Sequence, residues 1–116
     1  KIGITPKMRM FDGDIDPFSD AITLVKYYRS IIKSNSNKKV EFPTIRSEVV
    51  SAGSMIDFLK EHNRKDKLFL NYWIKYYFEK NLKGAKIKDE KFTSIKALMD
   101  TFKEYNEIYY NGEKVV

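Results

Sequence analysis

The sequence predicts a mainly α-helical domain with a small β component, organised around one central aromatic helix. Residues 66–82 contain no Gly or Pro, and six of the eleven residues from Leu68 to Phe78 are aromatic. Two further stretches, 17–33 and 92–105, repeat apolar residues at helical spacing. We therefore expect about four to five helices around the central one.

Length and composition define the class of protein. The 116 residues form a single predicted domain, residues 1–116, and 42% hydrophobic content with 15% aromatic content argues against disorder. Because the first residue is Lys rather than Met, we expect a fragment of a longer protein. The absence of Cys fits an intracellular, cytoplasmic location. No apolar run is long enough to span a membrane, so no membrane partner is expected.

The net charge of +6 is concentrated in the middle of the chain. Residues 21–91 carry sixteen basic and eight acidic side chains, a net charge of +8, whereas residues 1–20 and 92–116 each carry a net −1. Clustered Lys and Arg are typical of nucleic-acid binding. A Lys-rich solvated surface is the alternative explanation.

The N-terminal segment predicts the first β element. Apolar residues at even positions (Ile2, Ile4, Met8 and Met10) indicate an extended strand within residues 1–11, interrupted by Pro6. Asp12, Asp14 and Asp16 then alternate like the start of a calcium loop, but the Gly and Glu that such a loop requires are missing. We expect no metal site here.

Residues 17–33 form the first predicted helix. Asp16 is the expected N-cap and Pro17 the first helical residue. The apolar stripe consists of Phe18, Ile22, Val25, Tyr28 and Ile32, with Lys26, Arg29 and Lys33 on its flanks. A polar loop follows at 34–39.

Residues 44–62 allow three interpretations. Thr44 and Ser54 could each cap a short helix, with Gly53 ending the first, which is the outline of a helix-turn-helix. Glu48 and Ser54 fall where that motif usually has apolar residues. Two packed helices without a DNA role, or one continuous bent helix, are the alternatives.

The aromatic side chains of the central helix are predicted to form the core, since six rings on one helix more often pack than stack on bases. Asn63 or Asp66 caps this helix, and Tyr109 and Tyr110 are the better candidates for exposed rings.

The C-terminal segment predicts the second β element. Asn111-Gly112 lies between β-prone pairs, which is the strongest short hairpin signal. A hairpin directly after the helix at 92–105 resembles the wing of a winged-helix domain. The alternative is a two-strand ribbon that packs on the N-terminal strand.

No catalytic constellation is present. One His, no Cys and no glycine-rich phosphate loop leave few routes to catalysis, so we expect no enzyme and no cofactor. A small metal nuclease would require Asp12, Asp14 and Asp16 to converge with another carboxylate.

Eleven basic residues are the candidates for DNA phosphate contacts. They are Lys80, Lys83, Lys86, Lys88, Lys91, Arg64, Lys65, Lys67, Arg46, Lys38 and Lys39. Five of these lysines fall within residues 80–91, where the alternative role is to stabilise a helix C-terminus.

Two phage-type families share features with this chain. Tyr27-Tyr28, Ile31-Ile32-Lys33 and Phe58-Leu59-Lys60-Glu61-His62, over about residues 24–82, resemble the small basic N-terminal domain of the T4-type phage replicative helicase loader. The Asn111-Gly112 hairpin resembles the wing of winged-helix origin-binding domains of phages and mobile elements. Both resemblances imply DNA replication.

We therefore predict a basic domain that binds double-stranded DNA at an origin or regulatory site, in a phage or mobile-element replication or regulatory protein. The rival prediction is a protein-protein interaction or dimerisation module, with a homodimer as its simplest form and an exposed aromatic patch as its marker.

Overall fold

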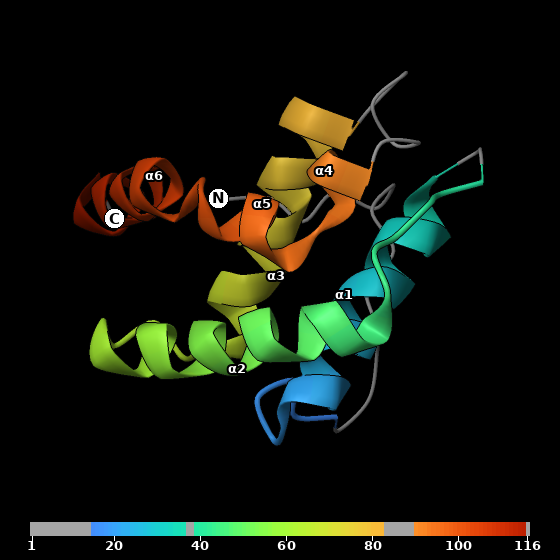
Figure 1. Ribbon diagram of the computed structural model, residues 1–116. Helices are drawn as coiled ribbons and strands as arrows, with labels where there is room; N and C mark the ends of the chain where they lie inside the picture. Colours follow the sequence, from blue (N-terminus) through green and yellow to red (C-terminus); the bar gives the residue numbers. More distant parts are fainter. Residues whose placement is uncertain (1–14, 37–38, 83–89, 116) are drawn as a thin grey trace.

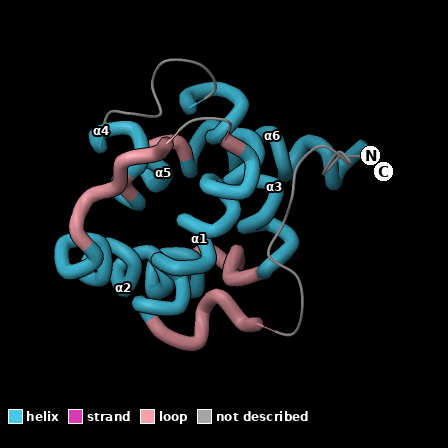
Figure 2. The backbone as a smooth tube through the Cα atoms, turned by 90° about the vertical axis from the view of Figure 1, so that its right-hand side faces the viewer, coloured by secondary structure: helices cyan, strands magenta, loops and turns pink. Residues whose placement is uncertain are grey.

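Every regular element in the described part of the chain is helical. The computed structural model describes residues 15–36, 39–82 and 90–115. Its elements are α1 (Ala21–Asn35), α2 (Ile45–Glu61), α3 (Lys67–Tyr77), the π-helical turn η1 (Phe78–Leu82), α4 (Glu90–Thr93), α5 (Ile95–Met99) and α6 (Phe102–Val115) (Figure 1). Figure 2 shows these residues as helices and loops only. The mainly α prediction is confirmed, whereas the predicted strand at 1–11 lies outside the described residues.

The central position of α3 is confirmed. Figure 1 shows α3 running through the middle of the molecule, between α2 and the segment that contains α4 and α5. Asp66 caps it by accepting a hydrogen bond from the backbone N–H of Leu68 (3.3 Å). Phe69, Trp73 and Tyr77 are buried in the core. Because these rings are core residues, they are not available to stack on bases.

α1 begins later than the sequence pattern indicates. Asp20 is its N-cap, accepting a hydrogen bond from the backbone N–H of Thr23 (2.8 Å). The predicted cap, Asp16, instead accepts from the backbone N–H of Phe18 (2.9 Å) and forms a separate turn. Either aspartate suits a helix start locally. The apolar stripe is buried except at Ile22, which is 44% exposed.

The predicted C-terminal hairpin and winged-helix layout are wrong. Asn111 and Gly112 lie inside α6, which continues to Val115. Phe102 and Tyr105 bury the first half of α6 against the aromatic side chains of α3. The backbone N–H and C=O groups of a helix pair with one another within the helix, whereas an isolated two-strand hairpin is only marginally stable. The anchored helix therefore prevails over the local turn signal.

The single helix predicted at 92–105 is also wrong. The chain is divided into α4, α5 and the start of α6. The Ser94 side chain accepts from the backbone N–H of Ala97 (3.1 Å) and caps α5. The Thr101 hydroxyl donates to the Leu98 carbonyl (2.7 Å) in the next turn. Side chains that bond to nearby backbone compete with a continuous helix, which explains both breaks.

The helix-turn-helix interpretation of residues 44–62 is wrong as well. α2 runs without interruption through Gly53, and Thr44 is its N-cap as predicted. One face of α2 packs on α1 and α5. Ala52, Met55 and Leu59 are buried on it. Of the three interpretations, only the continuous helix agrees with the structure.

Replacing Gly53 with Ala is expected to stabilise the protein. An added Cβ would meet nothing within 4 Å, and Gly costs about 0.5–1 kcal/mol relative to Ala inside a helix. Urea unfolding should therefore show a free energy of unfolding higher by about that amount. Destabilisation would instead indicate a turn at Gly53 that requires a positive φ.

Candidate nucleic-acid interface

The structure places seven of the eleven predicted phosphate-contacting residues. Lys38, Lys83, Lys86 and Lys88 lie outside the described residues. Lys39 is exposed and forms an ion pair with Glu41 (3.7 Å). Arg46 is exposed in the first turn of α2, and Lys91 is exposed in α4.

The positive charge of Lys80 is already paired with an acidic side chain. Its ammonium group bonds to the Glu104 carboxylate and contacts the Tyr76 hydroxyl (3.3 Å), and that hydroxyl donates to Glu104. The hydrogen bond with Lys80 holds the pKa of Glu104 below its ordinary value, and the same bond raises the pKa of Lys80. This side chain is therefore a weaker candidate for phosphate contact than the sequence indicated.

Arg64 joins two parts of the fold. Its Nε donates to the Asn106 side-chain oxygen (2.7 Å). Its guanidinium lies over the rings of Phe69 (5.4 Å) and Tyr109 (5.1 Å). Through these contacts the loop before α3 is attached to α6. We assign Arg64 a mainly structural role.

Lys65 and Lys67 line a surface hollow of about 500 Å³ between the start of α3 and the turn before α1. Its other lining residues are Ile15, Asp16, Pro17, Phe18 and Asp66. Two lysines and two aspartates give this hollow no net charge. We name it the mixed hollow.

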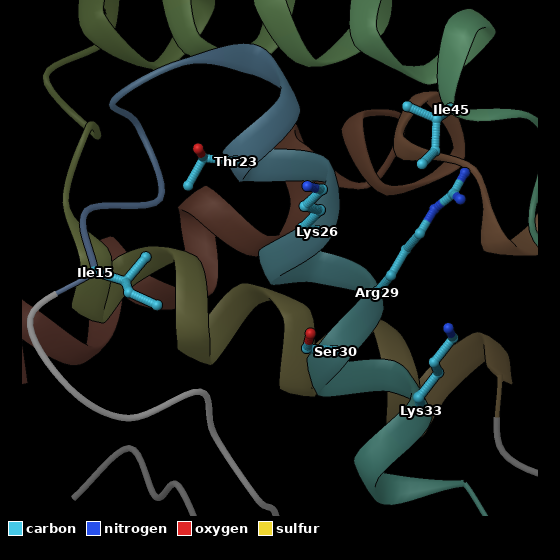
Figure 3. A pocket seen from close by; sticks show the side chains of 7 residues that line it. All are labelled: Ile15, Thr23, Lys26, Arg29, Ser30, Lys33 and Ile45. Carbon is cyan, nitrogen blue, oxygen red and sulfur yellow. The ribbon is translucent and has the colours of Figure 1, made fainter.

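A second hollow, of about 460 Å³, is lined by three cations from one face of α1. Lys26, Arg29 and Lys33 are spaced at i, i+3 and i+7, so a helix brings them into one row. Figure 3 shows the three side chains along α1, with Ile15 and Ile45 on either side of the row. Thr23 and Ser30 complete the lining. We name it the basic groove.

Arg29 is the most firmly held of the three cations. Its Nη2 donates to the Pro43 carbonyl, and its guanidinium lies 5.0 Å from the Phe42 ring centroid. Its Nε is buried without a hydrogen-bond partner among the described residues. Lys26 and Lys33 are exposed. The groove therefore combines one anchored guanidinium with two exposed ammonium groups, which act as point charges.

The charge of the basic groove is only partly offset by acidic side chains within electrostatic range, which are Asp20 for Lys26 and Glu48 for Arg29. In the ranges that the structure describes, Lys26, Arg29 and Lys33 form no ion pair. Asp20, less than two turns before Lys26, uses a carboxylate oxygen to cap α1. An anion entering the groove would meet three positive charges without displacing an acidic side chain.

The sequence pattern placed these three cations on the flanks of a helix, and the predicted DNA contacts did not include them. Their spacing was a usable signal, because i, i+3 and i+7 define one helical face. The hollow itself was not predictable, because Ile15 and Ile45 come from other segments.

The described residues contain no group of three or more His, Asp or Glu side chains placed to hold a metal ion. Among these residues, no helix is both long and apolar enough to cross a membrane. No protein-family profile matches the sequence, and no curated protein or solved structure matches it significantly.

Proposed function

We propose that this domain binds DNA by contacting phosphates in the basic groove of α1. The single observation that carries the proposal is the row of Lys26, Arg29 and Lys33 in one hollow, with no ion pair to a described acidic residue. The net charge of +6 acts in the same direction, because it attracts polyanions at long range. Phosphate contacts supply affinity without reading the base sequence.

The way in which DNA is held differs from the sequence-based prediction. A wing is not available, because the Asn111-Gly112 segment is part of α6. The contacts that we propose come from the side of α1 and not from a hairpin or from the second helix of a helix-turn-helix. The predicted setting in phage-type replication rests on the two resemblances alone and stays a prediction.

Charge reversal in the groove is expected to abolish most of the binding. Three phosphate contacts predict a slope of log affinity against log salt of about −2.7 for duplex DNA and about −2.1 for a single strand. The double variant Lys26→Glu/Lys33→Glu removes two contacts and should weaken binding by about 25- to 60-fold at roughly 0.1 M salt. Fluorescence anisotropy with labelled duplex and single-stranded DNA measures both quantities.

The matched control is Lys96→Glu/Lys103→Glu, which changes the net charge by the same amount at two exposed positions outside the groove. Only a small loss is expected, through the reduced overall charge. An equal loss in both double variants would show that net charge, and not the groove, determines affinity. No binding at low salt would contradict the proposal and favour the interaction-module prediction.

A further inference from the structure

The basic groove and the mixed hollow share a wall. Ile15 lines both of them, with α1 on one side and the start of α3 on the other. Ile15 is 36% exposed, so part of the side chain that borders both hollows is accessible to a ligand. A ligand that fills the basic groove and continues past Ile15 would reach Lys65 and Lys67.

The two hollows differ in chemistry. The charged groups lining the basic groove are all cationic, which suits phosphate. The mixed hollow offers lysine donors and aspartate acceptors, and its exposed apolar side chain is Ile15, because Pro17 and Phe18 are buried.

Both aspartates of the mixed hollow keep a free acceptor atom. Asp16 and Asp66 each use Oδ1 to accept a backbone N–H, from Phe18 and Leu68 respectively. Within the described part of the chain, their Oδ2 atoms have no hydrogen-bond partner. These oxygens can therefore accept hydrogen bonds from a ligand in the mixed hollow.

A nucleobase matches the mixed hollow better than a phosphate does. The exocyclic amino groups of bases donate to carboxylates, and lysine donates to base carbonyl and ring-nitrogen atoms. The faces of a base are apolar enough to cover the exposed side chain of Ile15. A phosphate would gain nothing there, because the two aspartates cancel the charge of the two lysines.

We infer that the ligand is a single strand of nucleic acid, with its phosphates along Lys26, Arg29 and Lys33 and an unpaired base in the mixed hollow beyond Ile15. Bases inside a duplex are paired and stacked, so they cannot enter a hollow on a protein surface. This inference rests on the proposed function and narrows it from DNA in general to the single-stranded form.

An abasic oligonucleotide tests this inference directly. A deoxycytidine strand of about eight nucleotides, within the usual length for single-strand sites, is compared with an abasic strand that carries the same phosphates. Loss of the hydrogen bonds to the base should weaken binding by about 5-fold or more. Duplex DNA of the same sequence should also bind more weakly than the intact single strand.

Ile15→Ala probes the same contact from the protein side without changing charge. It should weaken binding of the intact strand by about 3-fold or more and weaken binding of the abasic strand less, because Ile15 also lines the basic groove. The matched control is Ile108→Ala, because Ile108 is similarly exposed at 46% and lies on α6, which lines neither hollow.

The results of these binding experiments distinguish a failure of the single-strand inference from a failure of the proposed DNA-binding function. Equal binding of intact and abasic strands, or tighter binding of duplex DNA, would overturn the inference. If Lys26→Glu/Lys33→Glu still weakened binding by about 25-fold or more in that case, the proposed function would stand. Failure of every DNA form to bind at low salt would overturn both.

Discussion

Replacing Trp73 with Ala is expected to lower the free energy of unfolding by about 3–5 kcal/mol. Trp73 has no exposed surface and packs against Phe69 and Phe102. Its indole Nε1 also donates to the Thr101 hydroxyl (2.9 Å), which ties α3 to the turn before α6. The substitution therefore removes both core packing and a link between two elements.

Far-UV circular dichroism with urea is the appropriate measurement, because Trp73 is the only tryptophan and its replacement removes the tryptophan fluorescence signal. Small domains have about 5–15 kcal/mol of total stability, so a large part of the Ala variant could be unfolded. Trp73→Phe keeps an aromatic ring and should lose only about 1–2 kcal/mol.

The matched surface control is Val50→Ala. Val50 is 72% exposed on α2, and its truncation should change stability by no more than about 0.5 kcal/mol. A Trp73→Ala variant that unfolds at the same urea concentration as the parent protein would contradict the central role of α3.

Replacing Glu48 with Ala is expected to lower the free energy of unfolding by about 1–3 kcal/mol, and by more if a cavity remains. Glu48 is only 3% exposed, and its carboxylate accepts from the backbone N–H of Ile95 (2.8 Å), at the start of α5. Removal of the carboxylate leaves that buried N–H without a partner. Glu48→Gln retains an acceptor oxygen and should therefore be much closer to the parent protein in stability.

Glu48 also makes stability depend on pH. Burial raises the pKa of its carboxyl above the ordinary value of 4.5, although the hydrogen bond from Ile95 and the charge of Arg29 partly oppose this. Folded Glu48 therefore keeps its proton at pH values where unfolded Glu48 has lost it. As a result, the contribution of Glu48 to stability falls as the pH rises from 4.5 through the folded-state pKa.

The comparison with Glu48→Gln isolates this effect. The parent protein should gain stability relative to Glu48→Gln as the pH falls from about 7 towards 4.5, because the Gln variant has no group that titrates at this position. Urea unfolding at several pH values measures the difference. A constant difference across this range would contradict a raised pKa for Glu48.

The local pattern predicted most of what lies at the centre of the fold. Aromatic residues throughout 66–82 required a helix covered on several sides, and α3 has that environment. Four of the five residues in the predicted apolar stripe of α1 are buried. Such predictions succeed because a helical face that is apolar over several turns is stable only when it is covered.

Predictions from local sequence patterns were wrong where contacts with residues far away in the chain determined the structure. Asn111-Gly112 favours a hairpin over a few residues, but Phe102 and Tyr105 anchor α6 on α3. Glu48 looked misplaced in an apolar position, and its partner Ile95 is forty-seven residues away in the chain. No local pattern contains that information.

The candidate site likewise has some properties that follow from the local sequence and others that follow from long-range packing. Composition and helical spacing are local properties, so they were enough to predict a basic, helical chain around one aromatic core, with Lys26, Arg29 and Lys33 on one helical face. Which cations remain available depends on long-range packing. Long-range packing placed Glu104 beside Lys80 and Asn106 beside Arg64, and it set Ile15 and Ile45 beside α1 to make a groove.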